Sequence, residues 1–208
     1  MSYAPILFDL DGTLIDSLAD LTTALNLLRG ELNLSPVTIP AVRACVGDGA
    51  TLLVRRVLGD DLFSPSHLQR FLTLYSEHLA EETTLYPGIR TCLDRFSDRP
   101  LAVVTNKPYQ LTMDLLHALD LNRYFAVVIG GDSCPVKKPD PTPIKVALHR
   151  LDATAAGAIM IGDHHTDLKS GQAAGLDVCF CTWGFGDDGG CKPNHRVDNA
   201  TELLQVLL

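Results

Sequence analysis

Short runs of consecutive apolar residues recur along the chain, and most are followed by a segment with apolar residues at helical spacing. Strands that are buried on both faces read as continuous apolar runs, so we expect strands at these positions. The runs cover residues 6–8, 101–104, 126–129, 158–161 and 178–182. The helical patterns cover residues 89–96, 111–119, 143–150, 168–174 and 200–208. This alternation predicts an α/β fold with a doubly wound parallel sheet, a Rossmann-like core.

One long stretch between the first and second strands interrupts the alternation. It carries helical patterns only, at residues 17–32, 41–45, 50–58 and 66–80. We therefore expect an α/β core made of residues 1–16 and 85–208, with an all-helical cap subdomain inserted at residues 17–84. Ser17 is expected to cap the first helix of that insert, because serine oxygens accept hydrogen bonds from free N–H groups at helix starts.

Composition and charge narrow the classes of partner. The 208 residues are 46% hydrophobic and 20% charged, which is an ordinary globular balance, and the formal net charge is −8. Such a charge disfavours nucleic acid and anionic membranes as partners. We expect no membrane span, since no apolar run reaches the necessary length, and a cytoplasmic location, since the N-terminus does not resemble a signal peptide. A monomer and a homodimer are both compatible with the sequence.

The cysteines suggest a zinc site only on first inspection. Cys179, Cys181, Cys191 and His195 lie close in sequence, and none of the six cysteines forms a CxxC pair. Cys179 and Cys181 fall in an expected strand, where alternate residues share one face. We therefore interpret them as small buried core residues with reduced thiols.

Polar or charged residues follow the expected strands, at the edge where ligands bind in open parallel sheets. They include Asp9 and Asp11 after the first strand, Thr105, Asn106 and Lys107 after the second, Lys138 after the third, and Asp163 and Asp167 after the fourth. Clustered carboxylates repel one another unless a cation lies among them, and hard oxygen ligands suit Mg²⁺. An aspartate can attack phosphorus, and a second acid can protonate the leaving oxygen and later activate water. The pattern favours phosphoryl transfer.

Four stretches resemble the motifs of the haloacid dehalogenase-like superfamily, in that superfamily's order. They are Phe8-Asp9-Leu10-Asp11-Gly12-Thr13-Leu14, Val103-Val104-Thr105-Asn106, Lys138-Pro139-Asp140-Pro141, and Gly162-Asp163 through Asp167. The expected helical insert lies where a cap of the first type belongs, so the resemblance covers essentially the whole chain. Within the superfamily, residues 46–50, 104–108, 128–132 and 137–141 resemble the bacterial phosphoglycolate phosphatase branch.

This resemblance implies a division of labour among the residues. It implies that Asp9 is the nucleophile, Asp11 the general acid and base, Thr105 a hydroxyl donor to the phosphoryl group, and Lys138 a neutralising cation. It also implies that Asp9, Asp163 and the backbone carbonyl of Asp11 bind Mg²⁺, with Asp167 at the metal or just behind it. The backbone N–H groups of Leu10, Asp11 and Asn106 are expected to help hold the phosphoryl oxygens. The implied substrate is a small phosphate ester, with 2-phosphoglycolate favoured.

Other functions fit parts of this pattern. An EF-hand-type calcium loop starting at Asp9 would need Gly and Glu where Leu14 and Asp20 stand, so that interpretation is disfavoured. A phosphatase for a sugar phosphate, nucleotide or pyrophosphate, or a β-phosphoglucomutase-like phosphotransferase, would use the same scaffold. A non-catalytic phosphate sensor phosphorylated on Asp9 is disfavoured by Asp11 and by the long insert.

The insert and the fourth motif hold the residues whose interpretation stays open. Arg43 could pair with a substrate carboxylate, and Gly47-Asp48-Gly49 could offer N–H groups to an anion. The alternative is a helix connector with a solvated arginine. His164 stands where the superfamily often has Ser or Thr, and His165 follows it; we favour two ordinary loop residues over a metal or substrate role. We assign Lys107 a structural role, with a position at the rim facing the cap as the alternative.

Overall fold

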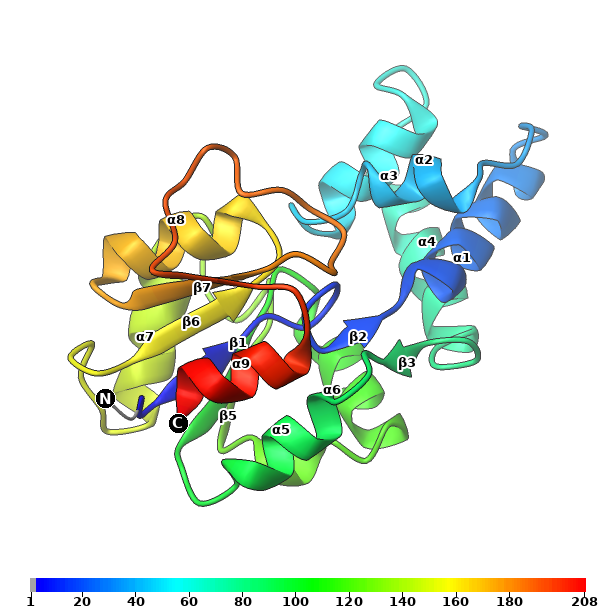
Figure 1. The fold of residues 1–208 in the computed structure, drawn as a ribbon. Helices are drawn as coiled ribbons and strands as arrows, with labels where there is room; N and C mark the ends of the chain where they lie inside the picture. The colour runs from blue at the N-terminus through cyan, green and yellow to red at the C-terminus, as the bar shows by residue number, and fades with distance from the viewer. Residues whose placement is uncertain (1–2) are drawn as a thin grey trace.

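The structure is a computed structural model that describes residues 3–208. Its centre is a parallel sheet of six strands in the order β5-β4-β1-β6-β7-β8 (Figure 1). The strands are β1 (Ile6–Phe8), β4 (Leu101–Val104), β5 (Val127–Ile129), β6 (Ile159–Gly162), β7 (Asp177–Cys181) and β8 (His195–Val197). The expected doubly wound α/β fold is therefore confirmed. The edge strand β8 was not predicted, because its three residues contain a single buried apolar side chain, Val197.

Helices cover both faces of the sheet, because the side chains of each strand alternate between two apolar clusters. Ile6 and Phe8 point to the face covered by α5 (Ile89–Arg95), α6 (Tyr109–Ala118) and α9 (Ala200–Leu207). Leu7, between them, points to the face covered by α7 (Thr142–Arg150) and α8 (His165–Ala174). A short 3₁₀ helix, Asn122–Tyr124, precedes β5. Helix α8 begins three residues before the predicted start, at His165.

Four helices form a separate body beside the sheet (Figure 1). They are α1 (Leu18–Glu31), α2 (Ile39–Arg43), α3 (Ala50–Leu58) and α4 (Pro65–Glu77). They bury their own apolar cluster, to which α6 adds only Leu111. None of the helices formed by residues 3–208 is long and apolar enough to cross a membrane.

The two chain segments that join the helical body to the sheet pair with each other. Strand β2 (Ile15–Asp16) lies antiparallel to β3 (Thr84–Leu85). Asp20, in the first turn of α1, accepts hydrogen bonds from the backbone N–H groups of Glu82 and Thr83, at 2.9 and 3.0 Å, and from the Thr83 hydroxyl at 2.5 Å. The start and the end of the insert are thus tied together.

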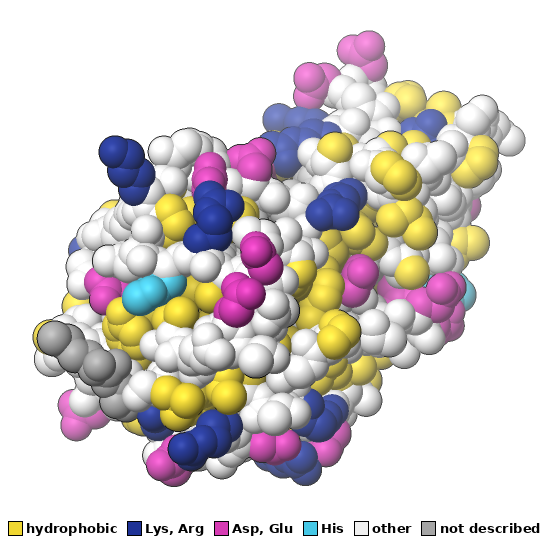
Figure 2. All heavy atoms as spheres, viewed as in Figure 1, with side chains coloured by type: hydrophobic (Ala, Val, Ile, Leu, Met, Phe, Trp, Pro, Cys, Tyr) yellow, Lys and Arg dark blue, Asp and Glu magenta, His cyan; other side chains and the backbone are white. Residues whose placement is uncertain are grey.

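Ser17 occupies the N-cap position of α1, but the predicted capping by its side chain is not found. Its side chain makes no capping hydrogen bond and instead donates one to Asp11, 2.5 Å away. Cys179 and Cys181 are fully buried in the sheet's core, as their alternation in β7 predicted. Positive and negative side chains are interspersed on the face of the molecule shown in Figure 2.

Candidate active site

Three buried aspartates converge at the carboxyl ends of β1 and β6. Asp9 directly follows β1, Asp163 directly follows β6, and Asp167 lies in the first turn of α8. An oxygen from each of the three carboxylates lies within 4.8 Å of the other two. Their positions in the fold explain this convergence, since β1 and β6 are adjacent and the loop after β6 leads straight into α8. The sequence placed all three at this edge of the sheet.

Lys138 is the cation beside these carboxylates. Its ammonium donates hydrogen bonds to Asp9 Oδ1 at 2.9 Å, to Asp167 Oδ1 at 2.6 Å and to the carbonyl oxygen of Val104 at 2.6 Å. The side chain is almost fully buried, so this ion pairing is little screened by water. Its ammonium pairs with two of the three carboxylates, Asp9 and Asp167, so one cation serves a cluster of three acids.

Burial and repulsion change the titration of the cluster. Burial, followed by the charges of Asp9 and Asp167, raises the pKa of Asp163 to about 8. Burial also raises the pKa of Asp9 to about 6, although Lys138 opposes that shift. Thr13 and the backbone N–H groups of Phe185 and Gly186 hold Asp163 in place, at 2.9, 2.8 and 3.2 Å. An oxygen-only set of buried, mutually repelling carboxylates fits Mg²⁺.

Asp11 points away from this cluster. Its two carboxylate oxygens accept hydrogen bonds from the Lys107 ammonium at 3.1 and 3.2 Å, and Oδ1 also accepts from Ser17. The Asp11 carboxylate is therefore not among the side chains that could share one ion with Asp9.

Lys107 connects Asp11 to the helical insert. Its ammonium lies 2.8 Å from the hydroxyl of Tyr75 in α4 and 4.4 Å from the centre of that ring. Burial alone would lower the pKa of Lys107, but Asp11 and Tyr75 outweigh burial and raise it. Lys107 is thus a buried cation that contacts both bodies of the molecule, which matches the alternative assignment rather than the purely structural one.

Thr105 and Asn106 follow β4 and are both buried. The Thr105 hydroxyl accepts a hydrogen bond from the backbone N–H of Lys107 at 3.2 Å. Asn106 accepts from the backbone N–H of Lys138 and donates to the carbonyl oxygen of Lys138, both at 3.0 Å, and to the carbonyl oxygen of Gly47 at 3.1 Å. Asn106 therefore fixes the Lys138 loop and joins it to the insert.

A cavity lies between the sheet and the helical body, with a volume of about 50 Å³, enough for a few water molecules or one small group. Its polar side is formed by Asp9, Asp11, Thr105, Asn106 and Lys107. Its apolar side comes mainly from the insert and includes Leu21, Leu53, Phe71, Leu72 and Tyr75. Within residues 3–208, the backbone N–H groups of Leu10, Asp11 and Asn106 donate no hydrogen bond, so they are available to a ligand.

The candidate residues of the insert lie in different places. Gly47 and Gly49 line the cavity, whereas Arg43 and Asp48 do not. The exposed Arg43 donates hydrogen bonds to the carbonyl oxygens of Gly184 and Phe185, in the loop after β7. Asp48 pairs with Arg56 at 2.6 Å. The structure thus gives Arg43 and Asp48 protein partners, and it brings the two glycines to the cavity.

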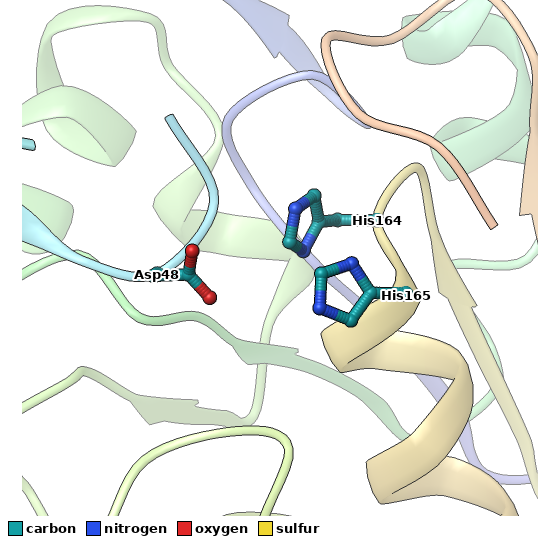
Figure 3. Close-up of side chains that lie close together, drawn as sticks. All are labelled: Asp48, His164 and His165. Carbon is teal, nitrogen blue, oxygen red and sulfur yellow. The ribbon is translucent and has the colours of Figure 1, made fainter. Parts of the chain in front are cut away.

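His164 and His165 open helix α8. His164 is the N-cap, and its Nδ1 lies 3.0 Å from the Thr166 hydroxyl, while Asp167 accepts from the His164 backbone N–H at 3.0 Å. Burial, followed by the charge of His165, lowers the pKa of His164. The two rings lie 4.0 Å apart and face Asp48 of the insert (Figure 3). His164 therefore has a structural role as the N-cap of α8.

Sequence reasoning missed several residues around the site. Ser17 and Tyr75 belong to the insert and carry no local motif, so only the folded chain reveals their contacts with Asp11 and Lys107. The glycine-rich segment after β7 also supports the site, because the backbone N–H groups of Phe185 and Gly186 donate hydrogen bonds to Asp163. The glycines of this segment were the one sequence signal of that contact. A side chain at Gly184 would not fit, because an added Cβ would lie 2.2 Å from Asp163.

Comparison with known proteins is consistent with this geometry. Residues 6–181 match the family model described as haloacid dehalogenase-like hydrolase. The phosphoglycolate phosphatase of Chromobacterium violaceum is 33% identical over 97% of this chain and 95% of its own length. That of Neisseria meningitidis serogroup A is 34% identical over 97% of this chain and 92% of its own length.

A solved structure has nearly the same fold. The predicted phosphoglycolate phosphatase from Haemophilus somnus 129PT superposes with a TM-score of 0.91 at 26% identity, over 100% of this chain and 99% of that one. The similarity covers the helical body as well as the sheet, so both bodies are parts of one shared architecture.

Proposed function

Because the chain belongs to the haloacid dehalogenase-like hydrolase family, where its relatives are phosphatases, we propose that it hydrolyses phosphate monoesters through a phosphoaspartate on Asp9. One observation carries the proposal: Asp9 lines a cavity together with Asp11 and Thr105, and its carboxylate lies 2.9 Å from the ammonium of Lys138. A nucleophile, a second acid, a hydroxyl and a buried cation are the groups that the reaction needs.

In the first half-reaction, an Asp9 oxygen attacks phosphorus and the P–O bond to the leaving group breaks. Asp11 gives its proton to the leaving oxygen. The ammonium of Lys138 and the free N–H groups of Leu10, Asp11 and Asn106 face the phosphoryl oxygens, and Thr105 donates its hydroxyl to them. In the second half-reaction, Asp11 takes a proton from water, whose oxygen attacks phosphorus and breaks the bond to Asp9.

Asp9, Asp163 and the backbone carbonyl of Asp11 would hold Mg²⁺, with Asp167 beside them. When bound, Mg²⁺ neutralises the negative charge that three buried carboxylates and a phosphoryl group bring together. Asp167 also pairs with Lys138 at 2.6 Å, so it orients the lysine that Asp9 faces.

Residues 17–84 act as the cap in this proposal. Helices α1, α3 and α4 supply the apolar side of the cavity, which excludes water from the phosphoaspartate. The paired strands β2 and β3 are the hinge at which the cap moves, because both connections between the bodies pass through them.

We propose 2-phosphoglycolate as the substrate. The cavity is small, and the relatives from Chromobacterium violaceum and Neisseria meningitidis carry the name phosphoglycolate phosphatase. The substrate carboxylate would lie near Lys107 and Gly49, where the N-terminus of α3 offers N–H groups to an anion. Arg43 is left out of this role, because it does not line the cavity.

The test is phosphate release by the purified chain from a panel containing 2-phosphoglycolate, sugar phosphates, nucleotides and pyrophosphate, with and without Mg²⁺. We expect Mg²⁺-dependent release with the highest kcat/KM for 2-phosphoglycolate, and no release by Asp9→Asn. Preference for another ester by a wide margin would reject the substrate. Phosphate release that survives Asp9→Asn would reject the mechanism, and isomerisation of a sugar phosphate would make the protein a phosphotransferase.

A further inference from the structure

A second group of metal-ligand side chains lies outside the aspartate cluster. Asp48, His164 and His165 each offer a carboxylate oxygen or ring nitrogen, and these three atoms lie within 4.8 Å of one another (Figure 3). Asp48 belongs to the loop between α2 and α3 of the insert, whereas the two histidines belong to the start of α8. All three are half-buried, so an ion can reach them from solvent.

We propose that Asp48, His164 and His165 form a binding site for Zn²⁺ or a similar first-row transition-metal ion, which holds the insert against the sheet domain. Two imidazoles and one carboxylate are the ligands that such ions prefer. Mg²⁺ prefers oxygen ligands alone, so this set and the aspartate cluster select different ions.

The start of α8 holds the ring of His164 through Nδ1. That nitrogen accepts a hydrogen bond from the backbone N–H of Thr166 at 3.4 Å and lies 3.0 Å from the Thr166 hydroxyl. Binding of an ion by Nε2 shifts the ring proton to Nδ1, which then donates to the Thr166 hydroxyl, and such a hydrogen bond on the far nitrogen is the usual support of a ligating histidine. In the described chain, Nε2 of His164 and both ring nitrogens of His165 make no protein hydrogen bond, so no partner has to be displaced from them.

Gly47 makes room for this ring beside Asp48. A Cβ on Gly47 would lie 2.7 Å from Nε2 of His164. The backbone of Gly47 has φ +124°, a value that residues with a side chain rarely adopt. The close approach of the insert loop to His164 therefore depends on glycine at this position. That approach is also what brings the carboxylate of Asp48 to the two rings.

Only a small movement of the ligand side chains is needed to bind an ion. Ligand atoms of a tetrahedral zinc site lie roughly 3.3 Å apart, given bonds of about 2.0–2.1 Å. Closing from separations of up to 4.8 Å requires rotation of the half-buried Asp48 and His165 side chains. Arg56 contacts only Oδ2 of Asp48, which leaves Oδ1 for an ion. Three protein ligands leave a fourth position for water.

The site spans the two bodies, and this has a mechanical consequence. Asp48 and both histidines can hold one ion only when the insert loop lies against α8. The bound ion therefore shifts the population toward that closed arrangement. Slower opening at the β2–β3 hinge follows, and with it slower exchange of substrate and product.

The test uses the full chain with excess Mg²⁺ and counts bound Co²⁺ and Zn²⁺ by equilibrium dialysis, with the visible spectrum of Co²⁺ as a second readout. We expect the wild type to bind one equivalent more than His165→Asn and Asp48→Asn. The exposed His149→Asn serves as the matched control and should keep the full count. The extra ion should persist in Asp163→Asn, and its Co²⁺ spectrum should lack a thiolate charge-transfer band.

Hydrogen exchange tests whether the bound ion slows opening at the β2–β3 hinge. Zn²⁺ should slow exchange at residues 15–16 and 84–85 in the wild type and not in His165→Asn. Equal ion counts in the wild type, His165→Asn and Asp48→Asn would overturn the proposal, as would loss of the extra ion in Asp163→Asn or a thiolate band from one of the cysteines. None of these readouts depends on the substrate.

Discussion

The ammonium of Lys107 lies 3.1 and 3.2 Å from the two carboxylate oxygens of Asp11, and both side chains are largely buried. This pair fixes the direction of the carboxylate that we assign as general acid and base. The same ammonium contacts Tyr75 of the insert. Closure of the insert and orientation of Asp11 are therefore coupled through one side chain.

Replacing Lys107 with methionine should lower kcat by roughly 100-fold, the lower end of the range of about 10²–10⁴-fold that a positioned acid or base contributes. Methionine keeps the apolar stem and removes the charge, so Asp11 and the Tyr75 hydroxyl lose a common partner. Steady-state kinetics at saturating Mg²⁺ measure the effect. Lys145→Met, at an exposed position in α7, is the matched control and should leave kcat unchanged. Equal kinetics for the two variants would show that Lys107 does not position Asp11.

The sheet could be predicted because its central strands β1, β4 and β6 are fully buried and read as continuous apolar runs. Residues 101–104 form β4 with the predicted bounds, and residues 50–58 form α3 in the same way. The short strands β2 and β8 were not predicted, because two or three residues are too few to show a periodic pattern. Their pairing depends on where distant segments meet.

Some residues of the site could be predicted from the sequence and others could not, for a similar reason. Asp9, Lys138 and Asp163 each follow a buried strand directly or within a short loop, so strand order alone brought them together. The contacts of Ser17 and Tyr75 could not be predicted, because they depend on how the insert packs against the sheet. The convergence of Asp48 with His164 and His165 has the same origin, since it joins residues more than a hundred positions apart.

Replacing Asn106 with alanine should lower kcat/KM by roughly tenfold or more. The amide makes two hydrogen bonds with the backbone of Lys138 and one with that of Gly47. Its loss leaves buried backbone groups unpaired, at a cost of about 1–3 kcal/mol for each group. Kinetics and thermal unfolding measure both effects. The exposed Asn122→Ala is the control and should change neither. A wild-type kcat/KM in Asn106→Ala would remove Asn106 from the positioning of Lys138.

Gly47→Ala and Gly30→Ala should change stability in opposite directions. An added Cβ at Gly47 meets His164 at 2.7 Å with φ +124°, so the insert loop must move away from α8. We expect a lower melting temperature and a higher KM, since Gly47 also lines the cavity. Gly30 lies inside α1 with nothing within 4 Å of an added Cβ, so alanine should stabilise there by about 0.5–1 kcal/mol. Thermal unfolding of the two variants side by side tests the expected signs.

Removal of Mg²⁺ should make stability fall as pH rises. The folded pKa of Asp163 is raised to about 8 and that of Asp9 to about 6, mainly by burial, whereas both titrate near 3.8 in the unfolded chain. At pH values between the unfolded and the folded pKa of each group, the folded state binds more protons than the unfolded state. The free energy of unfolding therefore decreases as pH rises. The contribution is complete below pH about 3.8 and is lost as pH passes about 8.

Melting temperatures measured from pH 5 to pH 9, with a chelator or with excess Mg²⁺, test this linkage. The chelated protein should lose stability across that range, and Mg²⁺ should raise the melting temperature more at pH 8 than at pH 5, because it binds the ionised carboxylates. Asp163→Asn removes the group with the larger shift and should flatten the profile of the chelated protein. A flat profile in the chelated wild type, or an equal gain from Mg²⁺ at both pH values, would contradict the assignment of this cluster as the magnesium site.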